Sequence, residues 1–329
     1  MKPELIDFVK AFKEKRILII GDMIADIYLK GDISRISREA PVLVIIESEE
    51  KTVAGGAANV VNNVATLGGK AFAVGVLGDD KGAENLKHIL ENNGVDTNGM
   101  LCDKKRKTIT KTRVIAGGRA TVSQQVVRID RECNEPISKE YEQEILSYIQ
   151  EIMPKMQGVV MSDYGSGTIT PTIRDFILKL SKKYNIPSIV DSRYAIYDFV
   201  GTDYVKQNDA ELSSAVGYTI DNENKLYQAA QEFIVKMQAK GILVTRGEKG
   251  MTLFESNGDV HNIPVSDKSE VFDVSGAGDT CVATFITALT TGAMPCQAAE
   301  ISNFASGIAV RKMGTATVSD KELIAVLEK

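Results

Sequence analysis

The sequence predicts an α/β fold, in which helices cover both faces of a mostly parallel sheet. Short apolar runs, each long enough for one buried strand, alternate along the 329 residues with longer stretches of helical character. Parallel strands need long crossover connections, so this alternation is typical of a sheet between two helical layers. No internal repeat or low-complexity linker divides the chain, and we expect a single domain over residues 1–329.

The individual elements follow from local composition and from the residues at their ends. Asp80 is a helix-capping residue, and Gly68 and Gly94 suit the position just after a helix. Asn257-Gly258 is a typical hairpin turn. Strands are expected at residues 16–20, 71–77, 158–161, 186–190, 242–245, 251–254 and 260–265, with one more ending at Val205. Helices are expected at residues 57–67, 80–93, 172–184, 223–238, 276–289 and 296–312, with a short one after Ser319.

Two stretches, residues 28–48 and 108–128, break the alternation. Both are rich in β-branched residues that alternate with polar ones, and neither has a helical partner. We expect them to form one small antiparallel sheet that lies over one end of the main body as a lid. A small antiparallel sheet with one apolar face tends to find a partner, so a homodimer through this lid is expected.

Composition and charge exclude several classes of protein. Hydrophobic residues make up 43% of the chain and charged residues 25%, which is ordinary for a soluble globular protein. The net charge of −5 is spread out, and the basic cluster at residues 104–107 lacks interleaved aromatic residues, so no nucleic-acid partner is expected. No stretch approaches the roughly 20 apolar residues of a membrane span, and the N-terminus lacks the apolar region of a signal peptide.

Cysteine and histidine usage points in the same direction. The four cysteines are far apart and form no Cys-x-x-Cys pair, so reduced thiols in a cytoplasmic protein fit better than a disulfide framework. His88 and His261 are the only histidines, and neither lies in a metal-ligand spacing. We therefore exclude a histidine-rich zinc site and expect both side chains at the surface.

The segment 273–280, Asp-Val-Ser-Gly-Ala-Gly-Asp-Thr, carries the most informative chemistry. An apolar stretch at residues 281–289 follows at once, so the small residues 276–278 should form a tight loop that opens a buried helix. The first N–H groups of a helix lack intrahelical partners and the helix dipole is positive there, which makes an anion site suited to phosphate. Asp279, kept ionised by this dipole, can accept the proton of a hydroxyl that attacks the phosphate. The segment therefore predicts phosphoryl transfer.

Polar residues also gather after the predicted strands, where ligands bind in open α/β sheets. Any one of them could be an ordinary helix cap, but together they predict a binding crevice. They are Asp22, Asp26, Asp191 and the residues at 162–165, 206–211 and 245–250. Gly55, Gly56 and Asn59 open the first main helix, where glycines let a ligand approach the backbone and the amide can bind sugar hydroxyls. The alternative is close helix–strand packing with Asn59 facing solvent.

Two better-known nucleotide motifs do not fit. Gly276-Ala-Gly278 lacks the third glycine of a dinucleotide-binding loop, because Cys281 stands in its place, and no early βαβ unit carries the motif. This disfavours a nicotinamide oxidoreductase. The P-loop pattern is absent as well, so phosphate binding must rely on another loop.

Taken together, these segments resemble the ribokinase-like (pfkB) carbohydrate kinases over essentially the whole chain. The stretch from Gly55 to Asn59 resembles the first signature of that family, and residues 273–280 resemble the second. Four other segments are similar to the kinase domain of the bifunctional heptose-phosphate kinase/adenylyltransferases: residues 34–42, 108–114, 124–130 and 314–319. The resemblance implies a ribokinase-like three-layer α/β/α fold with a mostly parallel central sheet and a small antiparallel β lid.

The resemblance also implies roles for individual residues. Asp279 would be the general base, next to an anion hole for the moving phosphoryl group formed by Gly276, Ala277 and Gly278. Asn208 and Glu211 would help to place the nucleotide phosphates and, through water, Mg²⁺. The sugar would contact Asp26, Gly55, Gly56, Asn59 and Asp163. ATP would contact Thr245, Arg246, Gly247, Gly250 and Asn303. The implied cofactors are ATP and Mg²⁺, and K⁺ near the anion hole is common in the family.

We therefore expect an ATP-dependent kinase for a sugar or sugar phosphate, with D-glycero-β-D-manno-heptose 7-phosphate as a candidate acceptor for a 1-kinase. A phosphorylated acceptor is favoured because basic lid residues can clamp a second phosphate; the alternative is that they are solvated. These residues are Arg35, Lys111, Arg113 and Arg128. Where the related kinases have lysines, this chain has Ser166 and Arg193, which can change how a substrate phosphate is held. Other acceptors (ribose, fructose, a hexose phosphate) and a non-catalytic sugar or nucleotide sensor on the same fold are the alternatives.

Overall fold

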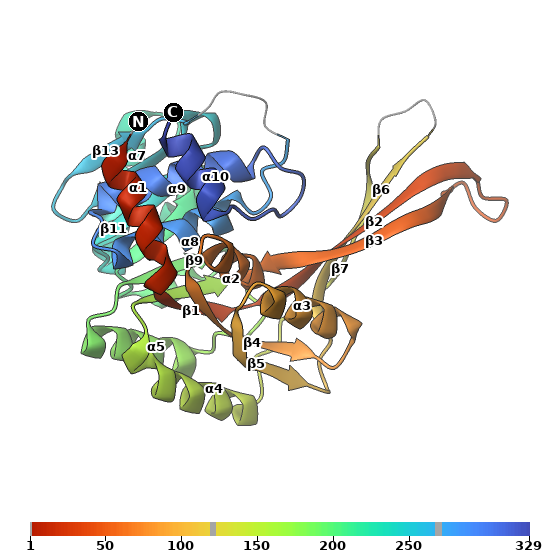
Figure 1. Ribbon diagram of the computed structural model, residues 1–329, viewed down its shortest axis with the longest axis horizontal. Coiled ribbons are helices and arrows are strands. Elements are labelled where there is room, and N and C mark those ends of the chain that lie inside the picture. The colour runs from red at the N-terminus through yellow and green to blue at the C-terminus, as the bar shows by residue number, and fades with distance from the viewer. Residues whose placement is uncertain (1, 119–122, 267–271) are drawn as a thin grey trace.

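The computed structural model describes residues 2–118, 123–266 and 272–329, and a nine-stranded sheet forms its centre (Figure 1). The strands lie in the order β13-β12-β11-β10-β9-β8-β1-β4-β5. Neighbours from β11 to β5 are parallel, whereas β12 pairs antiparallel with β11 and β13. The predicted mostly parallel sheet and its hairpin are thus confirmed. The strands are β1 (Arg16–Gly21), β4 (Lys70–Gly78), β5 (Asp96–Asp103), β8 (Gly158–Asp163), β9 (Ser188–Ser192), β10 (Tyr204–Asn208), β11 (Gly241–Thr245), β12 (Met251–Glu255) and β13 (Val260–Ile263).

Two hydrophobic cores lie on opposite faces of this sheet, as a buried parallel sheet requires. Alternate residues of β1 show the division, because Ile17 and Ile19 belong to one core and Leu18 and Ile20 to the other. The first core is completed by α1 (Pro3–Lys10), α2 (Ala57–Thr66), α3 (Lys81–Asn92), α8 (Ala277–Thr290), α9 (Pro295–Ala309) and α10 (Asp320–Leu327). The second is completed by α4 (Lys139–Ile152), α5 (Pro171–Tyr184), α6 (Asp209–Val216) and α7 (Glu223–Met237). The fold is therefore a three-layer α/β/α arrangement.

The ends of the helices follow the expected capping rules. Asp80 caps α3, since its Oδ1 accepts the N–H of Ala83 at 3.1 Å. The prediction omitted α4, although Ser138 caps it and buried isoleucines recur along it at helical spacing. It also omitted α1 and α6, which are only eight residues long and give too short a pattern to detect. None of the described helices is long and apolar enough to cross a membrane.

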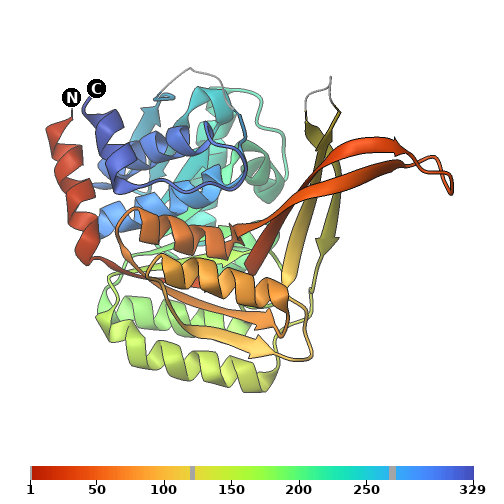
Figure 2. The same cartoon turned by 45° about the vertical axis from the view of Figure 1, so that its right-hand side comes forward.

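A second, four-stranded sheet projects from the body as a long arm (Figures 1 and 2). It consists of β2 (Met23–Ile36), β3 (Leu43–Gly56), β6 (Ile109–Gly117) and β7 (Gln124–Arg131), in the order β3-β2-β6-β7. Each hairpin is antiparallel, as expected for the lid, but the central pair β2–β6 is parallel. The reason is that β2 and β6 both run outward from the body, and these two outgoing strands lie side by side. The strands also extend beyond the expected ranges, since β2 starts at Met23 and β3 ends at Gly56.

The start of α8 depends on a glycine. Gly276 precedes the helix with φ +79°, in the left-handed region that side chains rarely adopt. A Cβ at this position would also lie 2.6 Å from Nδ2 of Asn59, a fully buried side chain on α2. Helices α2 and α8 can therefore approach each other at this point only because residue 276 has no side chain.

We expect Gly276→Ala to lower the free energy of unfolding by more than the cost of the backbone conformation alone. Gly217 is a matched control, because its φ is +80° and nothing lies within 4 Å of a Cβ there. Gly217→Ala should cost about 1–2 kcal/mol, the typical penalty for a left-handed alanine. Gly276→Ala should cost clearly more, since Asn59 must also move. Chemical denaturation of both variants measures the difference, and equal losses would show that the close approach is unimportant.

Candidate active site

The N-terminus of α8 provides the predicted anion site. Within the described residues, the N–H groups of Gly276, Gly278 and Asp279 donate to no protein acceptor. The N–H of Ala277 is the exception, because it lies 3.3 Å from the carbonyl oxygen of Val274 in a turn. Three backbone donors at the positive end of the helix thus remain available to an anion.

The carboxylate of Asp279 is held on both sides. Asn59 Nδ2 donates to its Oδ2 at 2.8 Å, and Tyr164 Oη donates to its Oδ1 at 3.0 Å. The pKa of Asp279 is raised to about 6, because burial, together with the nearby Asp191, outweighs the lowering effects of Asn59, Lys206 and Tyr164. The helix dipole therefore does not dominate, but Asp279 remains mostly ionised at neutral pH, the form that a base needs. Asn59 faces this buried carboxylate and not solvent.

Lys206, on β10, brings a positive charge to the same place. Its Nζ lies 2.9 Å from Asp191 Oδ2 and 3.8 Å from Glu211 Oε2. Burial alone would lower the pKa of Lys206, but these two carboxylates outweigh burial and raise it, so the side chain stays charged. A Cβ on Gly278 would lie 2.8 Å from this Nζ, so glycine is what lets the ammonium reach the helix end. The sequence predicted no role for Lys206 itself, although this residue begins the polar stretch 206–211 that was expected after the strand ending at Val205.

Two cavities meet at the start of α8. The smaller, of about 290 Å³, is bordered by Tyr164, Asp191, Arg193 and Asp279, among others. The larger cavity has a volume of about 820 Å³, and its walls are more apolar than those of the smaller one. Lys206, Val274 and Gly278 line both. A group at the helix N-terminus can therefore contact a ligand in either cavity.

Among the predicted sugar-binding residues, Asp163 lines the smaller cavity, whereas Asp26, Gly55, Gly56 and Asn59 are buried and outside its lining. Asp26 is buried at the base of β2, where Arg113 Nη1 lies 2.8 Å from its Oδ1 and Thr315 Oγ1 donates to its Oδ2 at 3.3 Å. A Cβ on Gly55 would lie 2.6 Å from Asp26 Oδ2, so the glycine makes room for the carboxylate. Gly56, with φ +53°, is the residue that turns β3 into α2.

Two aspartates shape the loop after β8. Asp163 accepts from Ser192 Oγ at 2.6 Å and from the N–H of Gly165 at 3.1 Å, and burial raises its pKa. Both of its oxygens therefore have protein partners, although it borders the smaller cavity. Asp22, fully buried, accepts from the N–H groups of Tyr164, Ser166 and Thr168 at 2.8–3.3 Å. This carboxylate fixes the loop that presents Tyr164 to Asp279.

On the nucleotide side, Asn208 and Glu211 form a capping box at the start of α6. Asn208 Oδ1 accepts the N–H of Glu211, and Glu211 Oε2 accepts the N–H of Asn208, each at 2.8 Å. The larger cavity is lined by Asn208, Thr245, Gly247, Gly250 and Asn303. Of the predicted ATP-binding residues, Arg246 is the one that turns away, because it forms ion pairs with Glu223 on α7 and, at 3.7 Å, with Asp209.

The four basic lid residues that were predicted to clamp a substrate phosphate have different surroundings. Arg113 is bound to Asp26 and lies over the ring of Tyr28, and Arg128 forms a two-pronged ion pair with Asp130. Arg35 is exposed on the outer half of β2. Lys111 has no ion-pair partner among the described residues, and its Nζ lies 5.0 Å from the centre of the ring of Tyr164, a residue that lines the smaller cavity.

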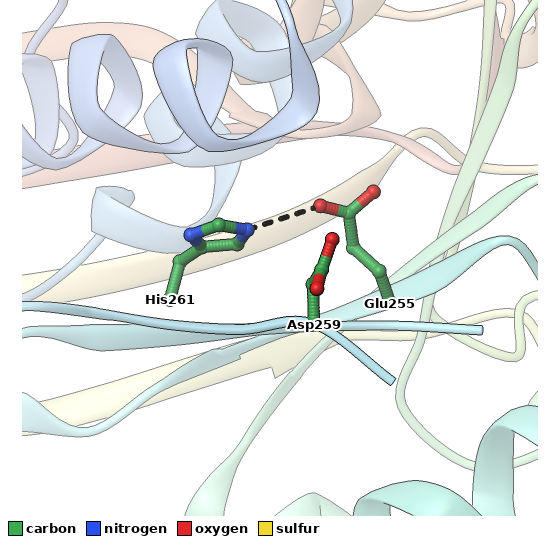
Figure 3. A group of neighbouring side chains, drawn as sticks. All are labelled: Glu255, Asp259 and His261. Carbon is green, nitrogen blue, oxygen red and sulfur yellow. Dashed lines mark ion pairs between the residues drawn. The ribbon is translucent and has the colours of Figure 1, made fainter. Parts of the chain in front are cut away.

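A separate group of potential ligands lies on the β12–β13 hairpin, away from both cavities. Figure 3 shows Glu255, Asp259 and His261 side by side, with His261 Nε2 3.3 Å from Glu255 Oε1. Their ligand atoms all lie within 4.8 Å of one another. Sequence spacing did not reveal this group, because the hairpin brings residues on two strands together. Asp259 is exposed, and His261 and Glu255 already form an ion pair with each other.

Similarity to known proteins agrees with this geometry. Residues 14–322 match the model of the pfkB family of carbohydrate kinases. The chain is 38% identical over 314 residues to the bifunctional protein HldE of Geotalea uraniireducens, covering 95% of this chain and 63% of that protein. It is 39% identical to HldE of Desulfatibacillum aliphaticivorans, covering 97% of this chain and 64% of that protein. The chain thus spans slightly less than two thirds of the length of these relatives.

Solved structures with similar folds include the ribokinase of Arabidopsis thaliana in complex with ribose and ATP (TM-score 0.75, 22% identity, 96% of this chain and 99% of that one). Phosphofructokinase-2 of Escherichia coli in complex with substrates and products is another (TM-score 0.75, 19% identity, 96% and 100%). At these identities the similarity concerns the fold, which is ribokinase-like as expected. The family match over nearly the whole chain identifies this protein as a member of the pfkB family of carbohydrate kinases.

Proposed function

We propose that this chain transfers the γ-phosphoryl group of ATP to a hydroxyl of a sugar or sugar phosphate. The observation that supports this most directly is that the two cavities share Gly278, whose N–H has no protein acceptor among the described residues, and that Asp279 borders the smaller cavity beside it. ATP would occupy the larger cavity and the acceptor the smaller one. The γ-phosphoryl group and the attacking hydroxyl would then meet beside Asp279 and the anion site. The solved structures of ribokinase with ribose and ATP, and of phosphofructokinase-2 with substrates and products, are consistent with this assignment.

In the proposed reaction, Asp279 accepts the proton of the attacking hydroxyl. The N–H groups of Gly276 and Gly278 stabilise the negative charge that grows on the phosphoryl oxygens, each worth about 3 kcal/mol by analogy with oxyanion-hole donors. General-base assistance contributes about 10²–10⁴-fold to the rate. Lys206 adds a positive charge beside the same helix end. Positioning and charge therefore supply most of the catalysis, as is typical of phosphoryl transfer.

Mg²⁺ fits the acidic side of this site. Asp191 and Glu211 border the smaller cavity with carboxylate oxygens, the ligands that Mg²⁺ prefers. Glu211 and Asn208 are engaged in the capping box, so they would hold the ion through water. Held there, Mg²⁺ would supply positive charge that offsets the negative charge of the nucleotide phosphates. K⁺ stays a prediction of the resemblance; phosphofructokinase-2 of Escherichia coli, of similar fold (TM-score 0.73), has been solved in complex with potassium.

The acceptor that we favour is D-glycero-β-D-manno-heptose 7-phosphate, the expectation from the HldE relatives. A phosphate on the acceptor needs a cation that is not already neutralised. Of the predicted lid clamp, Arg113 and Arg128 are each paired with an aspartate. Within the described residues Lys111 and Arg193 have no ion-pair partner; Arg193 lines the smaller cavity, and Lys111 lies over the ring of Tyr164, which lines it too. Ribose, fructose and hexose phosphates are the alternative acceptors.

A coupled ADP-release assay over free and phosphorylated sugars tests the acceptor. We expect turnover with the heptose 7-phosphate and a much higher KM for sugars without phosphate. Lys111→Ala should raise the KM for the phosphorylated acceptor by about tenfold, the usual effect of losing one charge-assisted contact. Lys30→Ala, which removes another lid cation that is paired with Glu49, is the control and should leave this KM unchanged. Equal activity on free and phosphorylated sugars would refute the clamp, and binding without turnover on every sugar would favour the sensor.

Asp279→Asn tests the base. The variant keeps the size of the side chain but cannot accept a proton, so we expect kcat to fall by about 10²–10⁴-fold while ATP and sugar still bind, as calorimetry can verify. In the wild type, kcat should fall as the pH drops through about 6, because the carboxylate of Asp279, with its pKa raised to about 6, then becomes protonated. Near-normal turnover of Asp279→Asn would remove this residue from the mechanism.

We further propose that the lid joins two copies of the chain, as expected from the sequence. Strand β7 carries two exposed apolar side chains: Val127 and Ile129 are 47% and 58% exposed. Val127 and Ile129 lie two residues apart on β7 and therefore on one face of the sheet, opposite Val114 and Thr112 of β6. A second copy offers the same apolar face and can cover it symmetrically.

Sedimentation velocity tests this dimer. We expect the wild type to sediment as a dimer and Ile129→Asp as a monomer, because a buried unpaired carboxylate is costly at such an interface. Val235 on α7, which is 76% exposed and lies away from the lid, provides the control variant Val235→Asp, which should remain dimeric. A wild type that is monomeric at all concentrations tested would contradict the proposal.

A further inference from the structure

Tyr164 connects the general base to the lid, and neither the family match nor the sequence predicts a role for it. Its hydroxyl donates to Asp279 Oδ1 at 3.0 Å, and the Nζ of Lys111 on lid strand β6 lies 5.0 Å from its ring centre. Its backbone N–H is fixed by Asp22, at 2.8 Å. The side chain is thus contacted at its hydroxyl and at its ring, its backbone is anchored by Asp22, and its one polar side-chain atom points at Asp279.

We propose that Tyr164 is a positioning residue for Asp279, which holds the carboxylate in the orientation that receives the acceptor proton. The proposal rests on the proposed kinase function. Asn59 holds Oδ2 from α2, and Tyr164 holds Oδ1 from the opposite side, so the carboxylate cannot rotate about its last bond. Each carboxylate oxygen has two acceptor sites, so one site on each oxygen stays open to an incoming hydroxyl.

The chemistry of a phenol suits this role. Burial raises the pKa of Tyr164 well above its usual value, and the charge of Asp279 raises it further, so the hydroxyl stays a neutral donor. A donor favours the ionised form of the carboxylate without adding a charge of its own. The hydrogen bond therefore opposes the effect of burial on Asp279 and keeps the base usable near neutral pH.

Other groups around Asp279 stay in place when the hydroxyl is removed. They face it from every neighbouring element: Asn59 on α2, Asp191 on β9, Arg193 after β9, Lys206 on β10 and Glu211 on α6. Near Tyr164, the lid adds Asp26 on β2 and Lys111 on β6, and Asp163 ends β8. A change in the titration of Asp279 on removal of the hydroxyl is therefore attributable to the lost hydrogen bond.

The test is the pH dependence of kcat in Tyr164→Phe, which keeps the ring and its contact with Lys111. We expect the acid limb to move up by about one pH unit, the size typical of one lost hydrogen bond to a charge. From a wild-type limb near 6, kcat would then fall about fivefold at pH 6 and little at pH 8 through ionisation alone. Any further fall in kcat that persists at pH 8 measures the contribution of Tyr164 to the orientation of the Asp279 carboxylate. The KM for ATP should not change.

Tyr148→Phe is the matched control, because Tyr148 on α4 donates to Asp96 Oδ1 at 3.1 Å, far from the site. It should leave the pH profile unchanged, and denaturation of both variants checks that each is folded. An acid limb of Tyr164→Phe that coincides with the wild type would overturn the proposal. If the wild type releases no ADP with any sugar, the proposed function fails instead. NMR titration of the Asp279 carboxyl, assigned with Asp279→Asn, then still decides whether Tyr164 controls its ionisation: an unchanged titration in Tyr164→Phe refutes the inference.

Discussion

The contact between α2 and the N-terminus of α8 is the constraint on which the rest of the site depends. Gly276 has no side chain, so Asn59 can reach across and hold Asp279. Gly278 has none either, so Lys206 can approach the same helix end from the sheet. A side chain at either position would separate the Asp279 carboxylate, the free backbone donors and the Lys206 cation, which now lie together at the start of α8.

Burying these charges together requires that they balance one another. Asp191 and Glu211 surround Lys206, and Lys206 in turn offsets part of the cost of burying Asp279. The result is a cation that stays ionised and a carboxylate whose pKa lies near, but below, neutral pH. A base with such a pKa can both accept a proton and release it again. Because burial, Asp191 and Lys206 all act on Asp279, the positive helix end alone does not determine the pKa of its carboxylate.

The lid and the body share residues at the site. Asp26 and Tyr28 belong to β2, which leaves the body directly after β1, and Thr315 from the segment before α10 donates to Asp26. Arg113 on β6 is bound to Asp26, and Lys111 on β6 lies over Tyr164. The smaller cavity is bordered by the loop that Asp22 holds in place, and the lid reaches this loop through the contact of Lys111 with Tyr164.

The sequence alone determined the alternating α/β pattern, the loop at residues 276–278 and the role expected of Asp279, because strand periodicity and helix-start signals are local properties. It could not determine side-chain partners between distant segments. Asn59 and Tyr164 meet Asp279 across more than one hundred residues of chain, and Arg246 turns toward Glu223 on α7. Similarly, the parallel pairing of β2 with β6 depends on the direction in which two separate hairpins leave the body. Only the tertiary structure decides these contacts, since packing and charge balance, and not local propensity, select them.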